Sequence, residues 1–251
     1  MGIFGFGKNN NGNSNSNITV DTRKEEAIIK LDTRKEVLNL CLEKNNLSKT
    51  KARVGVAMDY SGSMRDEFKN GLVQDTIERL FPIALEFDDN GELDFWLFEN
   101  GCRRLDSVDR NNFYSYVDYI MSKRYSMGGT AYAPVMKDIL KKYMKEEPSN
   151  VPTFIIFITD GDNSDKRETD AVIRESSKYN IFWQFVGLDS NGYEEFKYLR
   201  KLDDLSGRDI DNTSFIKMKN IRKMKDDEVY NSLIGEFPDW LKEAKNKGIL
   251  K

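Results

Sequence analysis

The chain has 251 residues, of which 32% are charged and 39% hydrophobic, and its formal net charge is −3. This composition suits a soluble globular protein with one sizeable α/β domain, and its slightly negative charge provides no general attraction for nucleic acid. The absence of histidine excludes serine–histidine–aspartate and cysteine–histidine nucleophiles and imidazole-bound zinc, so that a metal would need oxygen ligands.

No stretch of the chain approaches the roughly 20 apolar residues that a membrane-spanning helix needs. The first residues, MGIFGFGKNN, lack the basic and apolar regions of a secretory signal. The two cysteines, Cys41 and Cys102, are too few for the disulfide framework of a small secreted protein, and we interpret them as packing residues. We therefore expect a cytoplasmic protein with neither a membrane span nor a nucleic-acid partner.

The amino-terminal part changes character near residue 20. Residues 1–19 are predicted to be a flexible polar tail, because the run KNNNGNSNSN offers no apolar face to bury. Two similar units follow, DTRKEEAIIKL (21–31) and DTRKEVLNLCL (32–42), and their period of 11 residues is close to three helical turns. The pattern predicts one helical extension over 21–48, starting at Asp21 as N-cap and presenting the same face twice. This helix packs on the domain, or alternatively it binds a partner.

Six short runs predict β-strands. The run TFIIFIT (153–159) is almost continuously apolar and indicates a central parallel strand. The run at 102–105 follows the turn Glu99-Asn100-Gly101 and predicts an antiparallel strand at the edge of the sheet. The full set of predicted strands is 53–59, 92–98, 102–105, 153–159, 181–188 and 213–218.

Helical patterns separate the strands and predict right-handed β-α-β units. They cover 68–84 with a bend or an end near Pro82, 109–121, 134–144, 168–179, 193–202, and 226–247 with an interruption at Pro238. The predicted fold class is α/β, with a doubly wound, mostly parallel sheet, helices on both faces and one antiparallel edge strand. Residues 20–251 are predicted to form a single domain, which 226–247 closes.

Oxygen-bearing side chains follow two of these strands and occupy one loop. Asp59, Ser61 and Ser63 follow the first strand in MDYSGSM, Thr130 lies in the loop GGTAYAP, and Asp160 follows the central strand in TDG. Ligands in doubly wound sheets bind beyond the carboxyl ends of the strands. Each residue has a simpler explanation, since serines cap helices and aspartates form turns. Together they predict a site for one divalent cation: Mg²⁺, Ca²⁺ or Mn²⁺.

This five-residue set resembles the metal-ion-dependent adhesion site (MIDAS) of von Willebrand factor A (vWA) domains. The resemblance extends over residues 50–218. It implies that Ser61, Ser63 and Thr130 bind the cation through hydroxyl groups, while Asp59 and Asp160 act partly through water. A cation held mainly by neutral groups still attracts anions, and the resemblance implies a protein partner that supplies an acidic residue. In vWA relatives such an event moves a late helix, which would correspond to residues 193–202.

Longer segments resemble the bacterial tellurium-resistance (Ter) stress-response branch and its copine relatives. These segments are MDYSGSM, LFPIALEFDDNGELDFWLF, GGTAYAPVM and FWQFVGLDSNGYEEFKYLRKL. The resemblance implies a non-catalytic, metal-dependent protein-interaction module in a stress or toxic-ion resistance system. Two alternatives remain open: a Mg²⁺-dependent phosphohydrolase that uses Asp59, and a structural subunit with a vestigial metal site.

Overall fold

The computed structural model describes residues 14–88, 90–189, 192 and 194–250, so that most of the predicted tail lies outside the described residues. In this part of the chain a six-stranded sheet has the order β3-β2-β1-β4-β5-β6. All neighbouring strands are parallel except β2 and β3. The strands are β1 (Arg53–Asp59), β2 (Leu93–Phe98), β3 (Cys102–Val108), β4 (Thr153–Thr159), β5 (Ile181–Asp189) and β6 (Thr213–Lys219).

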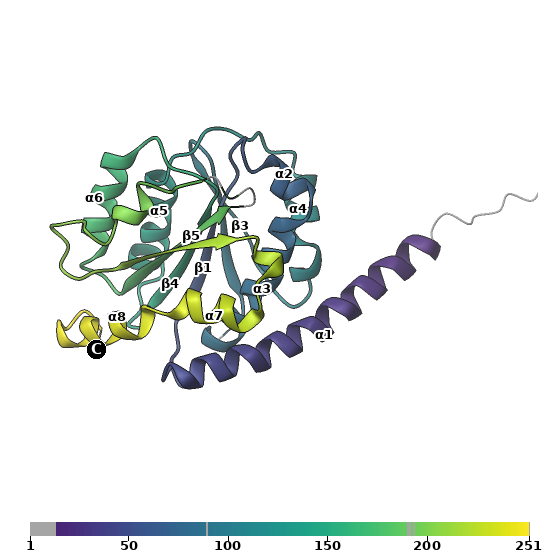
Figure 1. The fold of residues 1–251 in the computed structure, drawn as a ribbon, viewed down its shortest axis with the longest axis horizontal. Helices are drawn as coiled ribbons and strands as arrows, with labels where there is room; N and C mark the ends of the chain where they lie inside the picture. The colour runs from purple at the N-terminus through teal and green to yellow at the C-terminus, as the bar shows by residue number, and fades with distance from the viewer. Residues whose placement is uncertain (1–13, 89, 190–191, 193, 251) are drawn as a thin grey trace, which may run out of the picture.

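The α-helices lie on both faces of this sheet (Figure 1). They are α1 (Ser14–Lys44), α2 (Arg65–Lys69), α3 (Leu72–Phe87), α4 (Tyr116–Ser122), α5 (Ala133–Lys141), α6 (Lys166–Ser176), α7 (Asp226–Ile234) and α8 (Phe237–Asn246). Shorter turns are η1 (Phe113–Ser115), η2 (Lys142–Glu146), η3 (Leu199–Lys201) and η4 (Ile221–Lys223). The predicted fold class is confirmed.

Alternation along the strands builds a core on each side of the sheet. In β1, Val54, Val56 and Met58 join the cluster that includes side chains of α1, α3, α7 and α8. Ala57 faces the other way and packs in the cluster that includes α5 and α6. Every residue of β4 is buried, as expected for a central strand covered on both faces. The sheet is therefore rigid at its centre, where β1 and β4 lie side by side.

The duplicated segment forms one helix, and its two copies do present the same face. Ala27 and Leu38 occupy equivalent positions in the repeat and are both buried, whereas the equivalent Ile29 and Leu40 are 67% and 68% exposed. The buried face packs against α3 and α7. In Figure 1 the amino end of α1 projects away from the rest of the domain.

The bounds of α1 differ from the prediction at both ends. It begins at Ser14 rather than Asp21, because residues 14–20 contain neither glycine nor proline to prevent helix formation. It ends at Lys44 rather than at residue 48, because Asn46 adopts a left-handed conformation with φ of 58° and ends the helix.

Several other helices were also predicted with the wrong bounds. Pro82 lies inside α3 instead of ending it, because buried Phe81 and Ile83 hold both sides of the helix on the core. In place of a helix over 193–202, the described residues contain only the turn Leu199–Lys201. Phe196 has a φ of 50°, which interrupts a helix, and packs its buried ring against Gly187. The late helix that the resemblance implied as a moving part is therefore absent from the described residues of this segment.

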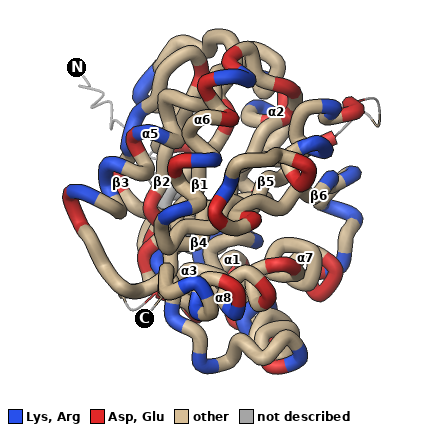
Figure 2. The backbone as a smooth tube through the Cα atoms, turned by 90° about the vertical axis from the view of Figure 1, so that its left-hand side faces the viewer, with Lys and Arg blue, Asp and Glu red and all other residues tan. Residues whose placement is uncertain are grey.

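Charges of both signs are interspersed along the chain (Figure 2). Within the described residues, no helix is both long and apolar enough to cross a membrane. Cys41 and Cys102 are unpaired.

Candidate metal centre

Asp59 ends β1 in a fully buried position and connects two strands. One carboxylate oxygen accepts a hydrogen bond of 2.8 Å from the backbone N–H of Ser61, and the other accepts one of 2.6 Å from the hydroxyl of Thr159 at the end of β4. The first bond closes a tight turn directly after the strand, which is a common use of aspartate. Asp59 therefore shapes the loop that carries the two serines and holds it against β4.

A continuous set of hydrogen bonds extends from this loop to Asp160. The hydroxyl oxygens of Ser61 and Ser63 lie 2.9 Å apart, and the Ser63 hydroxyl donates to Asp160 Oδ1 at 2.9 Å. The structure thus brings together four of the five predicted ligands. The alternative that the serines only cap a helix is not supported, since α2 has no side-chain cap hydrogen bond at its N-cap residue Met64.

Thr130 lies in a loop beside these residues. Gly62 N–H donates to the carbonyl oxygen of Gly128 at 2.9 Å, which joins the loop to the serine turn. The carbonyl of Thr130 accepts hydrogen bonds from both the backbone N–H and the hydroxyl of Ser164, each at 2.9 Å. Across the described residues, no hydrogen bond connects the Thr130 hydroxyl to the other four predicted ligands. Thr130, the fifth predicted ligand, therefore lies beside the other four, but its hydroxyl forms no hydrogen bond with them in the described part of the chain.

The glycines of this loop permit a close approach of the chain to β2. A Cβ atom on Gly129 would lie 2.6 Å from Asn100 Oδ1, and one on Gly128 would lie 2.8 Å from Glu99 Oε2. A side chain at either position would require the ends of the Glu99 and Asn100 side chains to move. The two glycines therefore let the loop that carries Thr130 lie close to the turn after β2.

Asp165 fixes the same loop from the other side. Its sequence position predicts a cap for α6, which it immediately precedes, but its carboxylate accepts hydrogen bonds from Tyr132 N–H at 2.9 Å and Ala133 N–H at 2.8 Å. These N–H groups belong to the start of α5, where the helix leaves its first donors unpaired. Asp165 is thus the N-cap residue of α6 by position, but its side chain caps α5, which is remote from it in sequence.

The sequence interpretation also missed two groups that support the cluster. Thr159 donates to Asp59, and the Tyr132 hydroxyl donates to the Gly161 carbonyl beside Asp160. Thr159 precedes Asp160 in the motif TDG, so the sequence already indicated that Thr159 lies close to the site. The contribution of Tyr132 depends on the packing of α5 and had no local signal.

Among the described residues, Asp59, Asp160 and Glu67 have no ion-pair partner, whereas Asp162 and Asp189 at the same edge pair with lysines. Burial raises the pKa of Asp59 to about 7, and the nearby charge of Asp160 adds to the effect, although hydrogen bonds from Thr159 and Ser61 oppose it. Burial also raises the pKa of Asp160, with a contribution from the charge of Glu67. In the described residues, none of these three carboxylates forms an ion pair. A bound cation would supply the missing charge and lower both raised pKa values.

The donor set fits a hard cation. It consists of two carboxylates and three hydroxyls, and Mg²⁺, Ca²⁺ and Mn²⁺ prefer oxygen ligands of this kind. Among the described residues, both at this edge and elsewhere, no group of three or more aspartate, glutamate or cysteine side chains is placed to hold a metal. A cation at this edge would therefore depend on the hydroxyls, as the sequence predicts.

Comparisons with known proteins agree with the fold. A family model described as a vWA domain found in the carboxyl terminus of TerF (vWA-TerF-like) matches residues 51–250. The uncharacterised protein YcbR of Bacillus subtilis (strain 168) is 46% identical over 224 residues, which cover 88% of this chain and 90% of that protein.

Solved structures are more distant and bear on the fold alone. BatB from Bacteroides thetaiotaomicron is 15% identical with a TM-score of 0.50, and the match covers 76% of this chain and 99% of BatB. A von Willebrand factor type A protein from Catenulispora acidiphila is 17% identical with a TM-score of 0.51, and the match covers 74% of this chain. The chain spans only 42% of that structure.

Proposed function

The chain belongs to the vWA family in its TerF-like branch, and from this premise we propose that it is a non-catalytic, divalent-metal-dependent protein-interaction module. The cation is Mg²⁺, or alternatively Ca²⁺ or Mn²⁺, and the partner is a protein that supplies an acidic residue. The observation that carries this proposal is the set of hydrogen bonds from Asp59 through Ser61 and Ser63 to Asp160 at the carboxyl edge of β1 and β4.

The protein groups have distinct tasks in this proposal. Ser63 donates its hydroxyl proton to Asp160, which leaves the lone pairs of its oxygen for a cation. Ser61 and Thr130 contribute hydroxyl oxygens in the same way, while Asp59 and Asp160 orient hydroxyls and water molecules. A cation bound here supplies a positive charge that neutral ligands only partly offset, and it therefore attracts a carboxylate from another molecule.

The family description supports a setting in bacterial stress response or resistance to tellurite and other toxic ions, since it names TerF. A cytoplasmic location is part of the proposal. It is supported by the unpaired state of Cys41 and Cys102, because the cytoplasm keeps thiols reduced.

The phosphohydrolase alternative has less support. Asp59 is fully buried, and both of its carboxylate oxygens accept hydrogen bonds, so neither is directed at a substrate. The residue two positions later is Ser61, where such an enzyme usually needs a second carboxylate. A structural subunit with a vestigial site is distinguished by experiment, because it would bind its partner without a cation.

The test compares partner capture from cell lysate by wild type and Thr130→Ala, each with Mg²⁺ and with EDTA. We expect capture only by wild type in Mg²⁺. Thr50→Ala is the control, because Thr50 precedes β1 and lies at the opposite end of that strand. Calorimetric titration of wild type with Mg²⁺ accompanies the capture assay. Equal capture in all four conditions would show that no cation bridges the two proteins.

A further inference from the structure

Both copies of the repeat in α1 leave equivalent side chains in solvent. Glu25 of the first copy corresponds to Glu36 of the second, and Ile29 corresponds to Leu40. All four side chains are exposed, and about two-thirds of each apolar one is accessible (67% and 68%). Single exposed apolar residues are common on protein surfaces, but here the same exposure recurs in both copies. The repeat therefore produces two similar outward sites.

The opposite side of the repeat attaches the helix to the domain. Arg23 pairs with Asp118 at 3.0 Å, and the equivalent Arg34 lies 3.7 Å from Glu78 in α3. The apolar side chains between these contacts belong to the core cluster shared with α3 and α7. Packing on the domain thus explains the inner residues of the repeat and fixes the orientation of α1. It does not explain the outward ones.

The outward side chains combine apolar groups with negative charge. At 3.6 residues per turn, seven exposed residues of α1 lie within about 40° of Ile29 around the helix axis, and we call them the outer face. They are Thr22, Glu25, Ile29, Thr33, Glu36, Leu40 and Glu43. Within residues 22–44 this face carries no lysine or arginine, and among the described residues none of its three glutamates forms an ion pair. The outer face therefore presents apolar side chains beside charges that are not neutralised.

Charge and spacing together indicate which kind of partner fits the outer face. Eleven residues of α-helix extend about 16 Å, so Ile29 and Leu40 lie three turns apart on one side of α1. A partner helix laid alongside can place its own apolar side chains against both, and lysines or arginines next to them would meet the glutamates. A second copy of this chain would bring two acidic faces together, and an anionic membrane surface would repel the face as well.

We propose that the outer face of α1 binds a basic amphipathic helix of another protein. Ile29 and Leu40 pack against apolar side chains of that helix, and the three glutamates pair with its lysine or arginine residues. The outer face shares no residue with the candidate metal centre. This contact therefore forms without a cation, and it goes beyond the proposed function.

A designed peptide tests the recognition chemistry. Its leucines repeat with the period of α1 and are flanked by lysines, and it is titrated against the full chain in EDTA by fluorescence anisotropy. Ile29→Ala and Leu40→Ala should each weaken binding about 10-fold, because each removes most of an apolar contact. Glu36→Gln should weaken binding less and reduce its dependence on salt concentration.

Two controls accompany the titration. Val151→Ala changes an apolar residue that is 37% exposed and lies outside α1, and it should bind the peptide as wild type does. A second peptide has the same composition with its leucines distributed around the helix, and it should bind more weakly. Thermal unfolding should give the wild-type temperature for the variants of the outer face, since these side chains are exposed.

Photo-crosslinking identifies what the outer face contacts in the cell. A photoreactive phenylalanine analogue takes the place of Leu40, and the crosslinked peptide is sequenced by mass spectrometry. We expect a segment of another protein in which lysines or arginines flank regularly spaced apolar residues. A crosslink to this chain's own sequence, to lipid or to an acidic segment would overturn the proposal, and so would the absence of any crosslink.

The peptide titration also has outcomes that contradict the proposal. Equal binding of the two peptides, or unchanged binding by both Ile29→Ala and Leu40→Ala, would reduce the interaction to general charge attraction. Because the titration is performed in EDTA, its failure leaves the metal-dependent function untouched. Likewise, a chain that binds no Mg²⁺ could still bind the peptide.

Discussion

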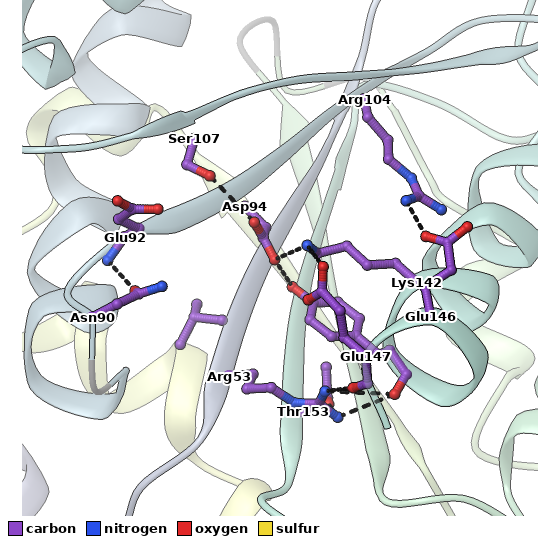
Figure 3. Close-up of polar contacts among 12 residues, drawn as sticks. Arg53, Asn90, Glu92, Asp94, Arg104, Ser107, Lys142, Glu146, Glu147 and Thr153 are labelled. Carbon is purple, nitrogen blue, oxygen red and sulfur yellow. Dashed lines mark hydrogen bonds and ion pairs between the residues drawn. The ribbon is translucent and has the colours of Figure 1, made fainter. Parts of the chain in front are cut away.

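Polar groups gather at both ends of the sheet, and Asp94 at the amino ends differs from Asp59 and Asp160 at the carboxyl ends in having a cationic partner. At the amino ends of the strands, Asp94 accepts hydrogen bonds from the Tyr143 hydroxyl at 2.6 Å and the Ser107 hydroxyl at 3.2 Å, and its Oδ2 lies 3.4 Å from the Lys142 ammonium (Figure 3). Arg104 pairs with Glu146 nearby and, together with Lys141, lowers the pKa of Glu146 to about 2. At the carboxyl ends of β1 and β4, Asp59 and Asp160 accept hydrogen bonds from hydroxyls and a backbone N–H group, whereas Asp189 at the end of β5 pairs with Lys217.

The difference indicates that the charged groups at the two ends of the sheet have different roles. A charge that is paired within the protein helps to hold strands and helices together. Because it is already neutralised, it attracts a ligand only weakly. A charge that is buried without a counter-charge lowers stability, and chains retain such groups mainly at sites of function. The amino-end network is therefore interpreted as structural, and the carboxyl-end cluster as the place where a cation completes the structure.

The largest expected effect concerns Asp160→Ala. Loss of this carboxylate removes one of two acidic ligands and the acceptor of the Ser63 hydroxyl, so affinity for Mg²⁺ should fall about 100-fold. The unfolding temperature in EDTA should stay the same or rise, because the carboxylate is partly buried without a counter-charge and its charge acts unfavourably on Asp59. Calorimetry and thermal unfolding measure the two quantities, and Asp160→Ala with undiminished affinity would remove Asp160 from the centre.

The next effect concerns the pH dependence of the metal-free protein. Because the folded-state pKa of Asp59 is raised to about 7 from an ordinary value of 3.8, the folded state holds a proton that the unfolded state has lost between these pH values. Stability in EDTA should therefore decrease as pH rises from 4 to 7, with a slope approaching about 1 kcal/mol per pH unit from this group. Chemical denaturation at several pH values measures the slope. Asp59→Asn should remove this part of it, and saturating Mg²⁺ should reduce it. An identical slope in the variant would contradict the account.

Breaking the amino-end network should reduce stability without changing the affinity for Mg²⁺, the opposite of what Asp160→Ala should do. Asp94→Ala leaves the Tyr143 hydroxyl without its acceptor and leaves Lys142 paired with Glu147 alone, and it should reduce the free energy of unfolding by about 1–3 kcal/mol. Affinity for Mg²⁺ should remain that of wild type, since the two clusters lie at opposite ends of the sheet. Urea denaturation and calorimetry on the same preparation test both parts, and a loss of Mg²⁺ affinity would show that the two ends are coupled.

The smallest of these effects should come from Asp165→Ala, which tests how the Thr130 loop is held. Two backbone donors at the start of α5 lose their acceptor, and loss of a cap reduces stability by about 1 kcal/mol. Because Thr130 is less firmly placed, affinity for Mg²⁺ should also fall, by less than in Asp160→Ala. Glu168→Ala, which changes an exposed carboxylate of α6, is the control. A change in stability alone would mean that the cap does not position Thr130.

Local sequence signals were sufficient for much of the fold. The apolar runs of β4 and β1 correctly indicated both strands, because a strand buried on both faces has few options besides apolar residues. The helix repeat was also predictable, since the burial of Ala27 and Leu38 follows from helical periodicity. The proximity of Asp59, Ser61, Ser63 and Asp160 was predictable as well, since side chains directly after neighbouring parallel strands lie at one edge of the sheet.

The sequence by itself determined the six strands, most of the helices and which polar groups share that edge, because these depend on short-range periodicity and on strand direction. Only the tertiary structure decided the contacts between them. Asp165 caps α5 instead of its own helix, Phe196 turns into the core instead of continuing a helix, and Glu67 is buried without a partner beside the serine turn. Each of these depends on which remote surface lies opposite the side chain. Hydrogen bonding and burial depend on which groups are close in space, and this cannot be deduced from the spacing of residues along the chain.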